Sequence, residues 1–284
     1  MSISDRYCAA CASEALKKVF QASSHHLADH EYSILRCARC KHCQAVGLND
    51  SETLSKIYSK SFFDTSAQKA GPGSAIVKNA RRRAKRLWKK YQPKEALDIG
   101  AGVGSFVEAL SEYCNAEGIE RSGETSLTST SAAPKMHKAD FQTCELKKKY
   151  DLITFWDVLS CFEQQIEVLE KAGAALHERG HIVLTAPMAD SFTARLLGRF
   201  WPLWIPPVNQ HFYSRQSIHE VARRSGLRIC ATYLHSKTVS LDFLVLKLLR
   251  ALGIKVSASA VSKIPSIGVR VNTYDLLEVH LRKQ

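Results

Sequence analysis

The segment from Ala96 to Phe106, ALDIGAGVGSF, constrains the fold of this chain more than any other. A short apolar run containing Asp98 leads into glycines at alternate positions, and an amphipathic pattern begins directly after them. Glycine lacks a Cβ atom, so it adopts backbone angles closed to other residues and lets a ligand lie against the main chain. The segment therefore predicts a strand, a ligand-binding turn and a helix that begins with unpaired backbone N–H groups.

The spacing of the glycines indicates which ligand this turn binds. A dinucleotide fingerprint reads G-x-G-x-x-G and places a pyrophosphate at the helix start, whereas Gly100, Gly102 and Gly104 give G-x-G-x-G. Asp98 beside the turn is a poor partner for a pyrophosphate but suits a ligand that carries an ammonium group. Glu120 follows twenty residues after Gly100, at the end of the next expected strand. A carboxylate at that place can accept hydrogen bonds from both hydroxyls of a ribose.

Strand and helix patterns alternate along the following residues. A helix is expected through Leu169 and Leu176 to Gly180, and strands are expected at 96–99, 116–119, 136–139, 150–156 and 181–185. Near-continuous apolar strands that alternate with helices predict an α/β fold with a doubly wound, mostly parallel sheet covered on both faces. Ligands of such sheets bind beyond the carboxyl ends of the strands. That edge would also carry Asp140, Phe141, Trp156 and Asp157.

Five segments in this order resemble the motifs of class I S-adenosylmethionine (SAM)-dependent methyltransferases: LDIGAGVGSF, AEGIE, ADF, YDLITFWDVL and LHERGHIVLTAP. The resemblance implies a seven-stranded sheet whose last antiparallel pair is formed by residues 227–234 and 275–281. It implies that Gly100, Gly102 and Gly104 pass close to the methionine moiety of SAM, with Asp98 near its amino group. Glu120 would hold the ribose, and the remaining cofactor-binding candidates are Asp140 and Phe141 at the adenine, and Trp156.

The resemblance also implies methyl transfer by in-line attack of a substrate nucleophile on the sulfonium methyl group. Many relatives read D-V-L-E-H after the fourth strand, but this chain reads DVLSC from Asp157. Because the Glu-His pair is missing from this chain, we expect no role for it here. For a hydroxyl acceptor, His211 or Asp157 is expected to act as the base. The other interpretation of His211 is a lid histidine bonded to the backbone.

Two C-x-x-C pairs precede this domain, separated by 25 residues. Four thiolates at this spacing predict a tetrahedral structural zinc site with the ligands Cys8, Cys11, Cys37 and Cys40. The family resemblance includes such N-terminal zinc-ribbon-like segments. Free cysteines or an iron–sulfur cluster are alternative interpretations, and Cys43, His25, His26 and His42 are alternative ligands. Relatives usually have glycine after the second cysteine of each pair, where this chain has Ala12 and Lys41.

A basic helix is expected between the cysteine pairs and the glycine turn. Eight basic residues and no acid lie between positions 78 and 90, in a chain of net charge +13: Lys78, Arg81, Arg82, Arg83, Lys85, Arg86, Lys89 and Lys90. Apolar residues at helical spacing predict that one face docks on the domain and the basic face points outward. A basic face of this kind is simply solvated, or it binds anionic lipid headgroups, RNA phosphates or a phosphorylated substrate.

These patterns divide the chain into a zinc-ribbon-like segment at 1–48, a helical linker with the basic helix at 49–92 and a methyltransferase domain at 93–284. Within the domain we expect a lid at 190–213 and an apolar helical insertion at 238–272, which packs on the domain or lies in a membrane interface. No apolar run is long enough to predict a transmembrane helix. Cysteine usage without a secretory leader predicts a cytoplasmic protein, with peripheral membrane contact as one interpretation.

The favoured acceptor is a small molecule, a glycan or a lipid-linked compound. An RNA methyltransferase is the first alternative, because it would use the basic helix and the zinc segment. However, the fourth strand runs into Phe155-Trp156-Asp157-Val158 and not into a D/N-P-P-Y sequence, which is typical of methylation at exocyclic base amines. A non-catalytic binding module that retains the fold is the second alternative. The acceptor atom and the oligomeric state are left open by the sequence.

Overall fold

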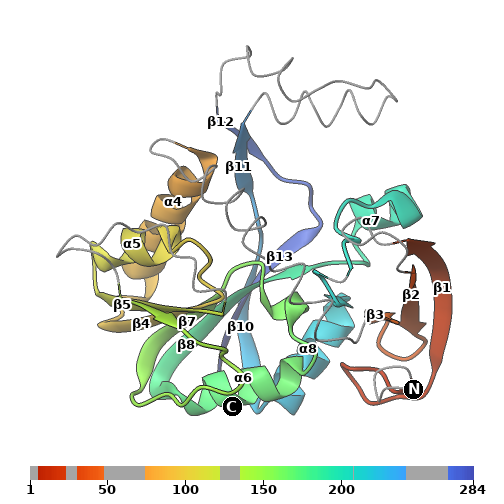
Figure 1. Ribbon diagram of the computed structural model, residues 1–284, viewed down its shortest axis with the longest axis horizontal. Coiled ribbons are helices and arrows are strands. Elements are labelled where there is room, and N and C mark those ends of the chain that lie inside the picture. Colours follow the sequence, from red (N-terminus) through yellow and green to blue (C-terminus); the bar gives the residue numbers. More distant parts are fainter. Residues whose placement is uncertain (1–5, 24–30, 48–73, 122–134, 207, 241–267) are drawn as a thin grey trace.

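The computed structural model describes residues 6–23, 31–47, 74–121, 135–206, 208–240 and 268–284 (Figure 1). His25, His26, most of the expected linker before the basic helix and most of the expected insertion at 238–272 lie outside the described residues. No helix in the described ranges is long and apolar enough to cross a bilayer.

A seven-stranded sheet forms the centre of the molecule (Figure 1). Its strand order is β10-β13-β8-β7-β4-β5-β6, and β13 runs antiparallel to both of its neighbours. The strands are β4 (Glu95–Ile99), β5 (Asn115–Glu120), β6 (Lys135–Lys138), β7 (Tyr150–Phe155), β8 (Leu176–Pro187), β10 (Leu227–Leu234) and β13 (Leu276–Lys283). The predicted mostly parallel sheet with an antiparallel pair at one edge is thereby confirmed.

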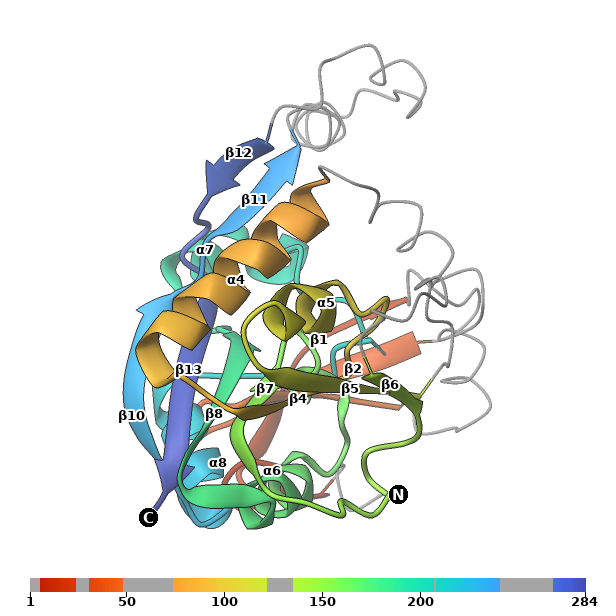
Figure 2. The same ribbon diagram turned by 90° about the vertical axis from the view of Figure 1, so that its left-hand side faces the viewer.

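Helices cover both faces of this sheet, as Figure 2 shows. One face packs against α4 (Ala75–Tyr91) and α5 (Ser105–Ser111), and the other against α6 (Gln165–Ala174) and α8 (Arg215–Arg224). Successive strand residues point to opposite faces. Leu152 therefore packs in one core with Ala84 of α4, whereas Ile153 packs in the other with Leu169 of α6. Burial on both faces explains why the strands read as near-continuous apolar runs.

The helix expected to end at Gly180 ends six residues earlier, at Ala174. Leu176 already belongs to β8, where it pairs with Tyr150, and the register then shifts before Leu152 pairs with His181. A Cβ atom at Gly180 would lie only 2.9 Å from the carbonyl oxygen of Tyr150, so this irregular part of the strand needs glycine. The apolar spacing of Leu176 fits a helix and a strand equally well, and pairing with β7 decides between them.

The N-terminal segment forms most of a second, antiparallel sheet. Its order is β1 (Leu16–Ser23), β2 (Glu31–Cys37), β3 (Cys43–Val46) and β9 (His211–Phe212), so its last strand comes from the expected lid. The lid also contains α7 (Phe192–Leu197) and the short 3₁₀ helix η2 (Gly198–Phe200). Trp201 and Trp204 are buried in a small core with Phe212, and Trp204 contacts Phe20 of β1 edge to face. These two tryptophans therefore join the lid to the N-terminal sheet.

The basic helix α4 matches the expectation of a docked apolar stripe, but its basic residues are not all directed at solvent. Four of its basic side chains contact the domain: Arg82 at Ser236 and Thr238, Arg83 at His235, Arg86 at Glu278 and Lys90 at Tyr233. Acceptors on β10, on β13 and near the hairpin of β11 (Lys237–Ser240) and β12 (Gly268–Val271) attract them inward. Ala80, Ala84 and Leu87 of α4 share a core with β4 and α5. The helix is thus packed on the domain along its apolar stripe, as the sequence predicted.

Candidate active site and metal centre

The glycine turn lies between β4 and α5, with φ angles of 69°, 56° and 80° at Gly100, Gly102 and Gly104. These are left-handed angles that side chains disfavour. A Cβ atom at Gly100 would lie 2.4 Å from Cγ2 of Val158, so this position needs glycine for packing as well. A Cβ atom at Gly102 would meet no atom within 4 Å. The backbone at Gly102 therefore lies open to a ligand.

The end of β5 fixes the turn in place. The backbone N–H groups of Gly100 and Ala101 both donate to the carbonyl oxygen of Ile119, at 2.9 and 3.1 Å. The N–H of Gly102 donates to Oε2 of Glu120 at 2.9 Å. Glu120 is buried, so the turn and a carboxylate at the end of the next strand form one unit. This is the juxtaposition expected from the spacing of Gly100 and Glu120.

Asp98 lies beneath the turn, with 5% of its surface exposed. Its Oδ1 accepts a hydrogen bond of 2.6 Å from Oγ1 of Thr154 on β7. Burial raises the pKa of the Asp98 carboxyl to about 7, and the bond from Thr154 and the charge of Arg83 only partly oppose this. A cation placed beside Asp98 would stabilise its ionised form. The electrostatics of this position therefore favour a positively charged ligand group.

Arg83 of α4 reaches this region, which sequence reasoning missed. Its guanidinium lies 4.4 Å from the ring centroid of Trp156, which directly follows β7. Burial lowers the pKa of Arg83, and the charges of Asp157, Glu278 and Asp98 oppose that effect. Among the described residues, neither Nε of Arg83 nor Nε1 of Trp156 has a hydrogen-bond partner, although both atoms are buried. Two such donors in one place suit an anionic ligand group.

A buried polar network holds Arg83. Its Nη2 lies 2.7 Å from Nε2 of His235, and Nδ1 of His235 lies 3.2 Å from Oε2 of Glu278. Glu278 also binds Arg86 at 2.6 Å and His280 at 2.7 Å. Burial opposes ionisation of Glu278, but its bonds with His235, His280 and Arg86 outweigh burial and hold its pKa well below the usual range. Ionised Glu278 can only accept from His235, which leaves Nε2 of His235 as the acceptor for Arg83.

Asp157 follows Trp156 at the carboxyl end of β7 and has a φ of 57°. Its backbone N–H donates to Oγ1 of Thr185 at 2.7 Å, and its Oδ1 accepts from the same hydroxyl at 3.0 Å. Left-handed backbone at a non-glycine residue is uncommon and is concentrated at functional sites. The side chain is exposed at the edge of the sheet that carries the glycine turn.

Asp140 and Phe141 follow β6 and occupy different environments. Oδ1 of Asp140 accepts from the backbone N–H of Gln142 at 2.9 Å, and its Oδ2 lies 3.8 Å from Arg121. The Phe141 ring is buried in the main core, where it meets Phe155 edge to face at a centroid distance of 6.1 Å. Asp140 is thus at the surface of this edge, while the ring of Phe141 lies beneath it.

His211 on β9 is buried, and both of its ring nitrogens have partners. Nε2 lies 3.2 Å from the carbonyl oxygen of Glu163, and Nδ1 lies 3.2 Å from Nε2 of His42. A carbonyl oxygen only accepts, so Nε2 of His211 carries the proton and Nδ1 accepts from His42. Burial lowers the pKa of His211 to about 4. In this arrangement His211 offers no lone pair to a substrate. The arrangement is that of a lid histidine bonded to the backbone.

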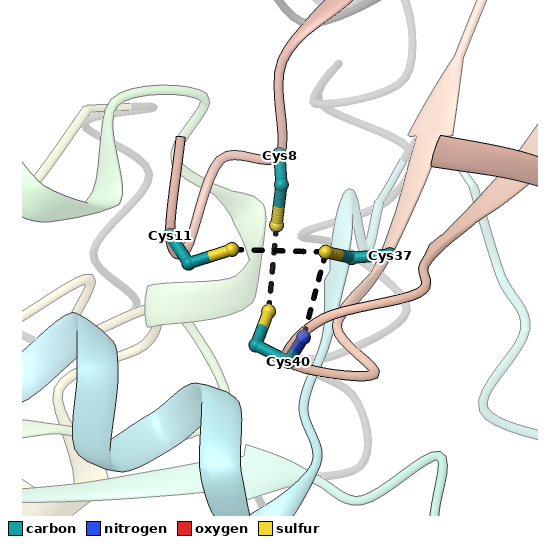
Figure 3. A group of neighbouring side chains, drawn as sticks. All are labelled: Cys8, Cys11, Cys37 and Cys40. Atoms are coloured by element: carbon teal, nitrogen blue, oxygen red, sulfur yellow. Dashed lines mark hydrogen bonds between the residues drawn. The ribbon is translucent and has the colours of Figure 1, made fainter. Parts of the chain in front are cut away.

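The four cysteines of the two C-x-x-C pairs converge, as Figure 3 shows. Their sulfur atoms all lie within 4.8 Å of one another, with 3.5 Å between Cys8 and Cys40 and 3.6 Å between Cys11 and Cys37. A tetrahedral zinc ion with Zn–S bonds of about 2.3 Å would hold its sulfur ligands about 3.8 Å apart. Both the type and the spacing of the donor atoms therefore fit zinc.

The turns that carry these cysteines form without glycine. Ala12 and Lys41, the residues after each second cysteine, have φ angles of 56° and 61°. Their N–H groups donate to the carbonyl oxygens of Cys8 and Cys37, at 2.8 and 3.0 Å, so the two turns are alike. Left-handed backbone at these two non-glycine residues has a conformational cost of roughly 1 kcal/mol each.

Two of the alternative ligands have other contacts in the structure. The thiol of Cys43 is buried in the core of the N-terminal sheet and points to the carbonyl oxygen of Lys41. His42 lies between His211 and Ser217, with its Nδ1 3.4 Å from Oγ of Ser217. Among the described residues, the group that could hold a metal consists of Cys8, Cys11, Cys37 and Cys40 alone.

Comparisons with known proteins agree with this geometry. A family model described as a methyltransferase domain matches residues 75–232. The fold is similar to that of magnesium protoporphyrin IX methyltransferase (ChlM) from Synechocystis PCC 6803 with bound S-adenosylhomocysteine (SAH), at a TM-score of 0.54 and 13% identity. That match covers 83% of this chain and 100% of the other. The same enzyme with bound SAM gives a TM-score of 0.53 at 13% identity, over 84% of this chain and 98% of the other.

A further structural neighbour is TnmH, with a TM-score of 0.50 and 14% identity over 78% of this chain and 57% of that one. No curated protein matches the sequence significantly. Because the family model covers more than half of the chain, including α4, the glycine turn and the sheet up to β10, the chain belongs to the methyltransferase domain family. It is therefore a methyltransferase.

Proposed function

We propose that this enzyme binds SAM across the carboxyl ends of β4, β5, β6 and β7 and methylates a small-molecule, glycan or lipid-linked acceptor. The main support for this cofactor site is the hydrogen bond of 2.9 Å from the backbone N–H of Gly102 to Glu120. The space next to Gly102 is open, because a Cβ atom there would meet no atom within 4 Å. Glu120 would accept the ribose hydroxyls, and the backbone of Gly100, Gly102 and Gly104 would lie along the methionine moiety.

The methionine moiety carries both an ammonium and a carboxylate, and two neighbouring features suit these charges. Asp98 is a buried carboxyl whose ionisation a cation would favour. Nε of Arg83 and the indole N–H of Trp156 are buried donors that have no partner among the described residues. We propose that Asp98 binds the ammonium, and that Arg83 and Trp156 bind the carboxylate. Asp140 would contact the adenine, with the ring of Phe141 supporting it from the core.

When bound, SAM supplies a methyl group on a sulfonium sulfur that a nucleophile attacks in line. This chain's contribution is to orient the acceptor and, where the acceptor is a hydroxyl, to remove its proton. We propose Asp157 as the base, because its side chain is exposed at the cofactor edge and Thr185 orients it. His211, the other candidate, would act as base only after breaking its bonds with Glu163 and His42. In the arrangement observed it positions β9.

Two observations support a small acceptor. One fold neighbour is named for a small-molecule acceptor, magnesium protoporphyrin IX. In addition, half of the basic residues of α4 bind partners within the domain, which leaves less of that helix for RNA than its sequence suggests. RNA methylation remains the competing function.

We also propose that residues 1–48 form a zinc-ribbon-like segment whose zinc ion is structural and is bound by Cys8, Cys11, Cys37 and Cys40. Oγ of Ser214 at the start of α8 donates to the carbonyl oxygen of Cys40 at 2.5 Å. Arg224 at the end of α8 donates to the carbonyl oxygen of Ala10 at 3.0 Å. Zinc would therefore fix both ends of α8 and, through β3 and β9, the lid.

An acceptor screen tests the function. Methyl-labelled SAM is incubated with the enzyme and separate lipid, glycan and RNA extracts, with Asp157→Asn as the second enzyme. We expect label in the lipid or glycan extract, and a rate 10²- to 10⁴-fold lower for Asp157→Asn if the acceptor is a hydroxyl. Salt-sensitive labelling of RNA alone would overturn the proposed acceptor class in favour of RNA.

A further inference from the structure

The outer face of the lid carries three large apolar side chains that nothing in the described structure covers. Phe192, Leu196 and Phe200 are 76%, 71% and 74% exposed. They are spaced four residues apart along α7 and the following η2, and Ala194 is the buried residue of α7. We call these three residues, with Arg195 and Arg199, the lid patch.

Apolar groups of this size are seldom exposed together unless they contact a partner or a membrane. The lid already has a buried side, because Trp201 and Trp204 pack against the N-terminal sheet. Folding of the described residues therefore leaves the lid patch in water while it buries the tryptophans a few residues away. The exposure is a property of the outer face of α7 and not of a loosely packed lid.

Charge indicates what covers the lid patch. Arg195 and Arg199 are exposed, and no acidic side chain among the described residues forms an ion pair with either of them. The guanidinium of Arg199 lies 4.9 Å from the ring centroid of Phe200. Aromatic and aliphatic side chains flanked by arginine suit the boundary between lipid headgroups and acyl chains, where the apolar groups are buried and the cations meet phosphates.

The protein also carries exposed positive charge outside the lid patch. Figure 1 shows the β11–β12 hairpin between α7 on one side and α4 on the other. Exposed basic residues of these elements include Lys78, Arg81 and Arg270. The chain as a whole has a net charge of +13. An anionic membrane surface would therefore attract the protein as a whole, in addition to the local attraction of Arg195 and Arg199.

We propose that the lid patch inserts into the interface of an anionic lipid bilayer, with Phe192, Leu196 and Phe200 at the acyl-chain boundary and Arg195 and Arg199 at the phosphates. The lid begins directly after β8, at the carboxyl edge of the sheet where the glycine turn also lies. Insertion would bring that edge to the membrane surface, which suits a lipid-linked acceptor. Membrane binding itself does not depend on the identity of the acceptor.

The test is co-sedimentation of the full chain with vesicles of phosphatidylcholine alone and of phosphatidylcholine with 30% phosphatidylglycerol. We expect the protein to bind the anionic vesicles at least about tenfold more tightly, with an affinity that falls as salt rises. The triple variant Phe192→Ser, Leu196→Ser, Phe200→Ser should lose at least about tenfold in affinity for anionic vesicles. Arg195→Gln with Arg199→Gln should reduce the preference for phosphatidylglycerol.

A matched control changes exposed apolar residues elsewhere. Val19 on β1 and Leu234 on β10 are 52% and 48% exposed, and their double change to serine should leave vesicle binding unaltered. Thermal unfolding and calorimetric SAH binding confirm that each variant is folded. The proposal is overturned if the wild-type protein ignores anionic vesicles, or if the triple variant binds them as the wild type does. It is also overturned if the triple change only converts a dimer to a monomer, since the lid patch would then bind a second copy.

Discussion

The backbone N–H of Gly102 and the Oε2 atom of Glu120 form a hydrogen bond of 2.9 Å. This bond joins the turn after β4 to the end of β5. It therefore holds the proposed methionine-binding turn next to the proposed ribose-binding carboxylate. The proposed SAM site depends on this unit, on Asp98 below it and on Arg83 beside it. Each contact predicts a separate measurable effect.

Asp98→Asn should have opposite effects on stability and on cofactor binding. Burial raises the pKa of Asp98 to about 7, well above the usual range of an aspartate, so protonation of this carboxyl stabilises the folded state at low pH. That stability is fully present below about pH 4 and is lost as the pH rises through 7. Asparagine keeps the acceptor for Thr154 without the charge, so at pH 8 the unliganded variant should be more stable, by on the order of 2–4 kcal/mol.

The same carboxylate should set the pH dependence of SAM binding. Because the proposed ammonium contact needs ionised Asp98, wild-type affinity for SAH should rise between pH 6 and pH 8 and then level off. In Asp98→Asn it should be weaker by at least about tenfold and nearly independent of pH over this range. Calorimetry at pH 6, 7 and 8 measures both effects. Equal affinities for wild type and variant would remove Asp98 from the site.

Arg83→Met should weaken binding only of ligands that carry the amino-acid moiety. We expect at least about a tenfold loss of affinity for SAH, because the variant removes a charge-assisted partner of the carboxylate. Affinity for 5′-methylthioadenosine, which lacks that moiety, should be unchanged. Arg81→Met, an exposed residue of the same helix, is the control and should leave both affinities unaltered. Equal losses for both ligands would indicate a general structural role.

The sequence predicted the glycine turn and Glu120 because local features specify them. Alternating glycines permit the left-handed backbone of the turn, and a helix and a strand of ordinary length then place Glu120 opposite the turn. Arg83 could not be predicted in the same way. It flanks the apolar stripe of α4, and its direction depends on His235 and Glu278, which lie more than 150 residues further along the chain. From the sequence alone, a basic residue beside the apolar stripe of a helix is predicted to be exposed to solvent.

The role of His211, like that of Arg83, depends on partners that are distant in the sequence. Its position before a helix start suggested either a base or a backbone-bonded histidine, and the choice depends on His42 and Glu163. His42 is brought to His211 because β3 pairs with β9, a contact between the N-terminal segment and the lid. Pairing of strands distant in sequence carries no local signal. The convergence of the four cysteines, in contrast, follows from their spacing.

Purified protein should contain about one zinc ion per chain. Cys8→Ser and Cys37→Ser should each lose the metal, because each removes one of four ligands. Cys43→Ser is the matched control, since its thiol lies outside the cluster, and it should retain zinc. Elemental analysis measures the content, and a chelator should lower the midpoint of thermal unfolding of the wild type. A folded protein free of metal, with the same midpoint before and after chelation, would contradict the zinc assignment.

Lys41→Gly should stabilise the zinc-loaded protein by about 0.5–1 kcal/mol. Lys41 is held at a φ of 61°, where glycine carries no steric penalty, and this gain exceeds the extra freedom of glycine in the unfolded chain. Ala38→Gly, at an exposed position of the same turn that does not have a positive φ, should be neutral or destabilising. Chemical denaturation in the presence of zinc measures both. A lower stability for Lys41→Gly would show that the left-handed turn is not strained.

Calorimetric titration of SAH into wild type, Glu120→Ala and Glu108→Ala tests the cofactor site most directly. Glu108 is an exposed residue of α5 and serves as the control. The proposed site predicts one SAH per chain, an affinity at least about tenfold weaker for Glu120→Ala, and no change for Glu108→Ala. The loss at Glu120 should extend to 5′-methylthioadenosine, which retains the ribose. Absence of SAH binding by the folded wild-type protein, or an unchanged affinity in Glu120→Ala, would contradict it.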